Sequence, residues 1–238
     1  ELFLKAKAVY VYDATRNQEI WGKNETAQLP LASLTKIITI LTAHSNLDKN
    51  ESVVFANEEW KLSDLSAFTL VTSSNEGAEA ISVAVELKKN IHFTSLMSIF
   101  SESLGLKQSY FNNSSGLDIS EFVSGGYGSA KDITKAFLYG INKFPEVFEK
   151  TSQAEETFYS VDGKPYLAKN TNADVFKDVG VIASKTGLTD LAGGNLAVAF
   201  DVGPDRRVVV VVLGSTQEGR FSDARLLMKT VRETLNIQ

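Results

Sequence analysis

The chain has 238 residues, 43% of them apolar and 22% charged, which is ordinary for a globular protein with one large domain or two small ones. Its net charge of −5 and its pI near 5.2 argue against nucleic acid as the main partner. The absence of cysteine excludes disulfides, thiol catalysis and cysteine-ligated metals. The two histidines, His44 and His92, lie far apart and outside any metal-binding spacing, so we expect no metal or other cofactor.

The first elements are predicted to be two strands and a helix. Residues 6–14 are rich in Val and Tyr and predict a strand, and residues 19–23 predict a second, shorter one after a turn. Pro30 suits the start of a helix, and the apolar spacing predicts a helix over about residues 31–45. His44 continues the apolar face of this helix, so we interpret it as a helix-face histidine.

The middle of the chain is predicted to be mainly helical, because apolar residues recur there at helical spacing. The four predicted helices are residues 65–72, 77–87, 93–104 and 130–141. Before the last of them, the glycine-rich residues 125–128 predict a flexible loop. A glycine-rich phosphate cradle is a weaker alternative, since no G-x-x-x-x-G-K pattern is present.

The character of the sequence changes at about residue 151. Short segments rich in Val, Thr and aromatic residues, separated by turn residues, predict antiparallel strands at 158–161, 179–185, 195–201 and 207–213, and residues 221–235 predict a closing helix. The predicted fold class is therefore α+β, an antiparallel sheet flanked by helices with an inserted helical lobe. Residues 1–238 would form a single domain, with a sheet subdomain (1–46 and 150–238) and a helical lobe (47–149).

Two residues in the stretch PLASLTKIITILTA (residues 30–43) do not suit a buried helix. Ser33 and Lys36 lie one turn apart and therefore on one helix face. Ser33 could be an N-cap, and Lys36 could extend to water along its apolar stem. A capping box, however, would have Glu or Gln where Lys36 stands, and a helix start disfavours a positive charge. The alternative is that Ser33 is a nucleophile and Lys36 is its base.

Two further motifs follow in the chain. Ser73-Ser74-Asn75 precedes a predicted helix and could simply cap it. Ser184-Lys185-Thr186-Gly187 ends a predicted strand and could be an edge strand that runs into a glycine turn. S-x-x-K, S-x-N and K-T-G in this order, however, form the motif set of class A β-lactamases and penicillin-binding proteins. The sequence around them, Phe111 to Asp118 (FNNSSGLD) and Ser184 to Ala197 (SKTGLTDLAGGNLA), supports the second group.

On these residues the chain resembles the low-molecular-mass penicillin-binding proteins, the serine D-alanyl-D-alanine carboxypeptidases and their endopeptidase relatives. The resemblance runs from the first strand to the last helix. It implies cleavage of the terminal D-Ala from peptidoglycan stem peptides through an acyl-enzyme, with β-lactams as covalent inhibitors. It also implies an exported protein at the periplasmic or other extracytoplasmic face of the cell envelope, because peptidoglycan lies outside the cytoplasmic membrane.

The resemblance assigns a role to each motif residue. Ser33 would attack the substrate carbonyl, and Lys36 would act as a free amine, its pKa lowered by burial and by a second cation, Lys185. Ser73 would relay a proton to the leaving amine, and Asn75 would bind the substrate backbone. The backbone amides of Ser33 and Leu188 would form the oxyanion hole.

The remaining assignments concern the substrate. Thr186 would bind its terminal carboxylate, and Gly187 would let its backbone approach closely. Arg220 would grip the same carboxylate, although an arginine at a predicted helix start could equally be a surface residue.

The sequence departs from the family pattern at two positions. Ser114 replaces the usual proline of the F-x-N-P-x-G-L-D motif, which we expect to loosen a loop without removing chemistry. Leu188 stands where some relatives have a histidine. Alternative functions are a class A-like β-lactamase, which the lack of an E-x-x-L-N motif disfavours, and a non-hydrolytic β-lactam sensor.

Membrane attachment is not visible in this sequence. The longest apolar run, Val208 to Leu213, is far too short to span a bilayer. Glu1 is followed by strand-like sequence and not by a basic start and an apolar core, so we expect no signal peptide in this chain.

Overall fold

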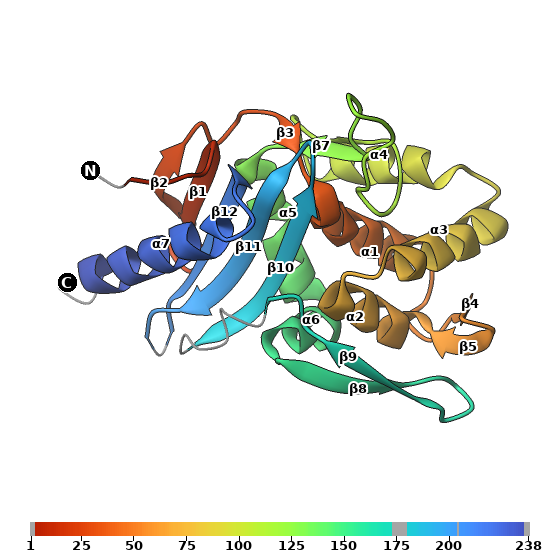
Figure 1. Cartoon of the computed structure of the whole chain (residues 1–238). Coiled ribbons are helices and arrows are strands. Elements are labelled where there is room, and N and C mark those ends of the chain that lie inside the picture. The colour runs from red at the N-terminus through yellow and green to blue at the C-terminus, as the bar shows by residue number, and fades with distance from the viewer. Residues whose placement is uncertain (1–2, 173–179, 204, 236–238) are drawn as a thin grey trace.

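The computed structural model describes residues 3–172, 180–203 and 205–235. A five-stranded antiparallel sheet in the order β10-β11-β12-β1-β2 forms its core (Figure 1). Its strands are β1 (Ala8–Asp13), β2 (Gln18–Lys23), β10 (Val181–Thr189), β11 (Gly193–Asp201) and β12 (Arg207–Ser215). Strand β1 pairs with β12, so the N-terminal strands join the C-terminal ones in a single sheet. The predicted α+β fold with an antiparallel sheet is thus confirmed.

Both faces of this sheet are covered, and the valine run of β12 shows how. Val209 and Val211 belong to a large apolar cluster with helices α1 (Thr35–Asn46) and α5 (Ala130–Lys143). Val208, Val210 and Val212 belong to a second cluster on the opposite face, under helix α7 (Gly219–Leu235). Because successive side chains of a strand point to opposite faces, a continuous apolar run is what a sheet covered on both faces requires.

Helix α1 is the centre of the helical part of the molecule. Nine consecutive residues of α1, Thr35 to Ala43, are buried, because the helix contacts α2, α3, α4 and α5 (Figure 1). The elements of this region are α2 (Leu62–Thr72), α3 (Asn75–Lys89), α4 (Phe93–Ser103) and the hairpin β4 (Ser52–Phe55)–β5 (Glu58–Lys61). The apolar spacing of the sequence predicts these helices to within a few residues, but the hairpin was not predicted.

The smaller elements include one clear correction. Gly126–Gly128, predicted to be a flexible loop, is strand β7 of a three-stranded sheet with β3 (Leu29–Pro30) and β6 (Tyr110–Phe111). Gly126 packs against α1, where a Cβ atom would collide with Thr35 Oγ1. The glycine is therefore required by close packing, and the flexible-loop prediction was wrong.

Two elements do not pack within the subdomain to which their position in the chain would assign them. One lies in the helical-lobe range but packs on the large sheet, and the other lies in the sheet range but packs on a helix of the lobe. Helix α5 falls within residues 47–149 but packs on β12 and β1. The hairpin β8 (Glu155–Tyr159)–β9 (Pro165–Lys169) follows α6 (Pro145–Phe148) and η2 (Glu149–Ser152), and it packs against α2. The chain boundaries of the two subdomains remain a prediction.

His44 makes the stability of the fold depend on pH. Its ring is largely buried, lies 3.0 Å from Ser66 Oγ through Nε2, and packs on Phe144 at 4.8 Å between centroids. Burial lowers the pKa of His44 from 6.5 to about 4, against a smaller opposing effect of Glu146. Above pH 6.5 the imidazole is neutral in both states, whereas below it the unfolded chain binds the proton first. Stability should therefore fall by about 3 kcal/mol as the pH drops from about 6.5 to about 4.

This loss can be measured by urea unfolding between pH 7.5 and 4. The variant His44→Gln should lack the part of the decline that His44 causes. His92→Gln is the matched control, because it replaces a histidine whose side chain is 91% exposed and therefore leaves the core intact. A His44→Gln profile parallel to that of the wild type would contradict the assignment.

Candidate active site

Ser33 and Lys36 meet at the start of α1. Ser33 lies in the short 3₁₀ turn η1 (Ala32–Leu34). Lys36 is the second residue of α1, and its exposed fraction is 0%. Lys36 Nζ lies 2.9 Å from Ser33 Oγ, 2.7 Å from Asn75 Oδ1 and 2.8 Å from the carbonyl oxygen of Ser115. The lysine therefore does not extend to water. The capping alternative for Ser33 is also wrong, because the N-cap of α1 is Leu34 and no side chain caps the helix.

Tight packing fixes the turn that carries Ser33. Ala32 adopts a positive φ of 48°, which is costly for a residue with a Cβ atom and is typical of functional sites. Gly116 lies against the Ala32 carbonyl, where any side chain would collide. A Cβ atom at Gly187 would lie 2.9 Å from the Leu31 carbonyl oxygen and 3.2 Å from Ser33 N. Strand β10 and the loop of residues 111–118 thus both pack closely against the backbone of residues 31–33.

The three residues of the Ser73-Ser74-Asn75 motif make different contacts. Ser74 caps α3, since its Oγ accepts a hydrogen bond of 2.9 Å from Gly77 N. Ser73 ends α2 in the left-handed conformation, with φ 59°, and its Oγ accepts a 2.8 Å hydrogen bond from Lys185 Nζ. Asn75 binds Lys36. The helix-cap interpretation therefore holds for Ser74 alone, and the other two residues contact the lysines.

Lys185, Thr186 and Gly187 lie inside β10, the edge strand of the large sheet. The prediction that the strand ends at Lys185 was wrong, because β10 continues to Thr189. Lys185 is 2% exposed and donates to Ser73 Oγ and, at 2.9 Å, to the carbonyl oxygen of Thr186. The side chain of Lys185 thus connects the sheet to the helical part of the molecule.

Arg220 is not a surface arginine. It is 7% exposed, and its NH1 donates a 2.7 Å hydrogen bond to the carbonyl oxygen of Gly187. Leu188, the next residue of β10, is by contrast 43% exposed. The guanidinium group is therefore held at the strand that carries the third motif.

Three buried basic side chains, those of Lys36, Lys185 and Arg220, dominate the electrostatics of this site. Burial lowers the pKa of Lys36 to about 7, and the charge of Glu76 opposes this effect. Burial, followed by the charges of Lys36 and Arg220, lowers the pKa of Lys185 well below its usual range. A neighbouring positive charge was expected to lower the pKa of Lys36, but burial accounts for that shift. Neighbouring charges instead contribute to the lowered pKa of Lys185. Within the described residues, none of these three basic side chains forms a salt bridge with a carboxylate. This charge distribution favours binding of an anion.

Some groups of the site were not predicted from the sequence. Ser115 contributes its backbone carbonyl oxygen to Lys36, and Ser114 contributes its own to Thr39 Oγ1 at 2.6 Å. Backbone contacts leave no signal in residue identity, so only the matched FNNSSGLD motif could have indicated this loop. Thr171 lies 2.6 Å from Thr186 through the two Oγ1 atoms and belongs to none of the three motifs.

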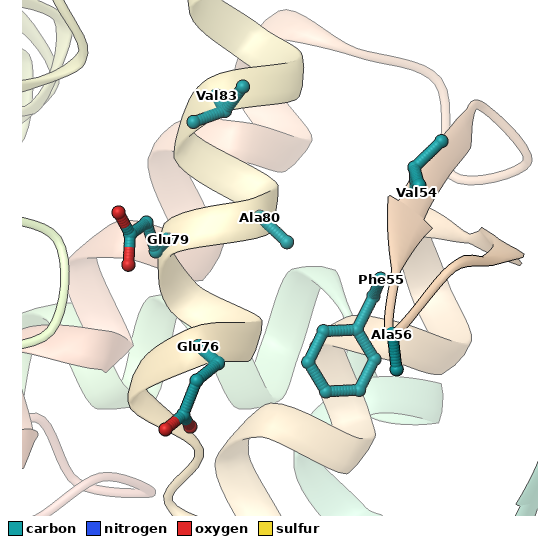
Figure 2. A pocket seen from close by; sticks show the side chains of 7 residues that line it. All are labelled: Val54, Phe55, Ala56, Glu76, Glu79, Ala80 and Val83. Carbon is teal, nitrogen blue, oxygen red and sulfur yellow. The ribbon is translucent and has the colours of Figure 1, made fainter.

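A hollow of about 540 Å³ lies between α3 and the β4–β5 hairpin (Figure 2). It is lined mainly by apolar side chains, with Glu76 and Glu79 at its α3 side. Glu76 follows Asn75 in the chain, but none of the motif residues lines the hollow. We therefore place the candidate active site at Ser33 and not here. Among the described residues, no group of three or more His, Asp or Glu side chains is placed to hold a metal ion.

A serine hydroxyl beside a buried lysine, on an α+β fold, is the arrangement of the serine hydrolases that carry these three motifs. The family model described as D-alanyl-D-alanine carboxypeptidase matches residues 42–217, which is well over half of the chain. The chain therefore belongs to the D-alanyl-D-alanine carboxypeptidase family, and the predicted resemblance is confirmed. The matched range includes the second and third motifs, whereas Ser33 and Lys36 precede it and Arg220 follows it.

Individual relatives extend this similarity over most of the chain. D-alanyl-D-alanine carboxypeptidase DacD of Escherichia coli is 27% identical over 91% of this chain, and DacF of Bacillus subtilis is 25% identical over 92%. This chain spans only 60% of the length of each of these two relatives. Among solved structures, penicillin-binding protein D2 from Listeria monocytogenes in its ampicillin-bound form is 27% identical, with a TM-score of 0.80 over 96% of this chain and 98% of that one.

Proposed function

We propose that this protein is a serine D-alanyl-D-alanine carboxypeptidase that releases the terminal D-Ala of peptidoglycan stem peptides through an acyl-enzyme. The observation that carries the proposal is the 2.9 Å contact between Lys36 Nζ and Ser33 Oγ, at a lysine whose pKa burial lowers to about 7. At neutral pH a large fraction of such a lysine is a free amine, which can take a proton from the serine. The family membership supports this choice of substrate.

Acylation begins at Ser33. Its Oγ attacks the carbonyl carbon between the two terminal D-Ala residues while its proton passes to Lys36 Nζ. The backbone N–H groups of Ser33 and Leu188 stabilise the oxyanion that forms, and each such donor is worth roughly 3 kcal/mol of barrier. The close packing of Gly187 supports this pair, because a Cβ atom there would lie only 3.2 Å from Ser33 N.

The leaving amine needs a proton when the C–N bond breaks. Ser73 can relay one to it from the lysines, because its Oγ is bound to Lys185 Nζ at 2.8 Å. Asn75 binds Lys36 through Oδ1 and leaves its amide N–H groups for a carbonyl of the substrate backbone. Lys36 loses the proton that it took from Ser33 as the leaving amine is protonated, so it is again a free amine. Water then attacks the ester carbonyl, Lys36 accepts a proton from this water, and the proton passes to Ser33 Oγ as the ester C–O bond breaks, which regenerates the enzyme.

The terminal carboxylate of the substrate binds at the other end of the site. Thr186 donates its hydroxyl to it, and the positive charge of Arg220, which is bound to the carbonyl oxygen of Gly187, lies beside this position. Gly187 leaves room for the substrate backbone next to β10. Carboxylates accept charge-assisted hydrogen bonds readily, so this end of the site selects a free C-terminus.

We propose two kinds of partner, peptidoglycan stem peptides as substrates and β-lactams as covalent inhibitors. The similar D2 protein from Listeria monocytogenes was solved with ampicillin bound, which supports the second kind. Peptidoglycan lies outside the cytoplasmic membrane, so we propose that the protein acts in the cell envelope, in the periplasm or an equivalent compartment. Within the described residues, no helix has the length and hydropathy needed to cross a bilayer.

The proposal can be tested with benzylpenicillin and a pentapeptide that ends in D-Ala-D-Ala. Timed intact-mass measurements should show a lasting adduct, proteolysis should map it to Ser33, and the pentapeptide should lose one D-Ala. Rapid drug hydrolysis without an adduct would instead favour a β-lactamase. A lasting adduct without release of D-Ala would favour a β-lactam sensor.

A further inference from the structure

Two threonine hydroxyl groups meet at the edge of the site. Thr171 Oγ1 lies 2.6 Å from Thr186 Oγ1, and either oxygen could donate the hydrogen bond. Thr186 belongs to β10, whereas Thr171 follows the end of β9. The partner of Thr186 thus comes from a different part of the fold than the K-T-G motif itself.

The backbone around Thr171 is anchored to the same elements that hold the site. Thr171 N donates a 3.3 Å hydrogen bond to the carbonyl oxygen of Val71, two residues before Ser73. Asn170 Nδ2 donates to the carbonyl oxygen of Thr151 at 2.9 Å, and Thr151 Oγ1 accepts a 2.9 Å hydrogen bond from the backbone of Ser184. Thr151 therefore ties the residue before Thr171 to β10. The hydroxyl of Thr171 is positioned before a substrate binds.

The direction of the threonine pair follows from counting protons. Each hydroxyl has one proton and two lone pairs. Thr186 is 4% exposed, so few other partners can reach it. If Thr186 gives its single proton to a substrate carboxylate, Thr171 must be the donor of the 2.6 Å hydrogen bond between them. Hydrogen bonds in series polarise one another, and the one that ends on a charged acceptor gains most.

We infer that Thr171 is a positioning residue for the terminal carboxylate of the substrate, and that it acts by donating its hydroxyl to Thr186. The inference rests on the proposed function, because it assumes that Thr186 binds this carboxylate. Lys185 Nζ and Arg220 NH1 donate to the adjacent carbonyl oxygens of Thr186 and Gly187, so an anion here also lies close to the guanidinium of Arg220. Thr171 therefore contributes to the preference for a free C-terminal carboxylate over a neutral group.

The test compares Thr171→Val, which removes the hydroxyl at nearly constant shape, with Thr171→Ser, which keeps it. The probes are benzylpenicillin and its methyl ester, and the readout is the second-order rate of acylation by intact mass. Thr171→Val should acylate with the free acid about 5- to 20-fold more slowly, because a hydrogen bond to a charged group is weakened. Its rate with the neutral ester should change less than about 2-fold, since that ligand has no charged acceptor. Thr171→Ser should retain the wild-type preference for the acid.

Other outcomes have distinct meanings. An equal loss with acid and ester would indicate a purely structural role and overturn the inference. Loss in Thr171→Ser as large as in Thr171→Val, or no loss in either, would overturn it as well. If the wild-type protein formed no Ser33 adduct even with the free acid, the proposed function itself would fail, and the Thr171 inference with it.

Discussion

Replacing Ser33 with alanine is expected to abolish both the benzylpenicillin adduct and the release of D-Ala. The residual rate should be lower by a factor on the order of 10⁴ or more, because no other group takes over from a missing nucleophile. In the folded protein, Ser33 Oγ is the hydroxyl closest to Lys36 Nζ, at 2.9 Å, and Ser73 Oγ is bound to the other lysine. The intact mass after incubation with the drug and the D-Ala released from the pentapeptide are the two measurements.

Ser74→Ala is the matched control for this variant. Ser74 belongs to the second motif, but its Oγ caps α3 through Gly77 N. Losing this cap should cost about 1 kcal/mol of stability and leave the acylation of Ser33 intact. Adduct formation that persisted in Ser33→Ala would assign the nucleophile elsewhere and contradict the proposed mechanism.

The residues of the candidate site were easier to predict from the sequence than the contacts that hold them in place. Ser33, Lys36 and the K-T-G residues belong to a spaced sequence pattern, so the sequence alone was enough to single them out. The contribution of Ser115 is a backbone carbonyl, and that of Thr171 depends on where β9 ends, so neither leaves a local signal.

The structural role of a glycine is also hard to predict from the sequence alone. The glycine-rich residues 125–128 were predicted to be a flexible loop, yet Gly126 lies in a strand against Thr35. A glycine that allows close packing cannot be told from one that allows flexibility until the neighbouring element is known. The sheet was more predictable, because the alternate burial of β12 on two faces follows directly from its valine run.

The end of strand β10 was predicted wrongly for a related reason. The strand was predicted at residues 179–185, and its first residue lies outside the described part of the chain. At the other end, the observed β10 extends four residues beyond Lys185. Gly187 suggested a turn, but it is needed inside the strand because the Ser33 backbone passes so close. A tertiary contact thus overrode the local preference of glycine for turns.

Acylation should accelerate as the pH rises through about 7, because Lys36 must be a free amine to accept the Ser33 proton. Burial lowers the pKa of Lys36 from 10.5 to about 7, so the ammonium form, which cannot act as a base, prevails below that value. The pH profile of kcat/KM for D-Ala release reports this group in the free enzyme. Lys36→Met should lose roughly 10²- to 10⁴-fold in kcat/KM and no longer show the inflection near pH 7.

Replacing Glu76 tests whether Lys36 causes this inflection, because the direction of the expected pKa shift is known. Its negative charge raises the pKa of Lys36, and its side chain is exposed at the start of α3. Glu76→Gln should therefore move the inflection to lower pH and raise the rate below pH 7, while the plateau at high pH stays the same. An inflection that did not move in Glu76→Gln, or one that survived in Lys36→Met, would show that another group is the base. Because Lys185 is also buried and has a lowered pKa, a shift caused by Glu76 is what would identify Lys36 as the titrating lysine.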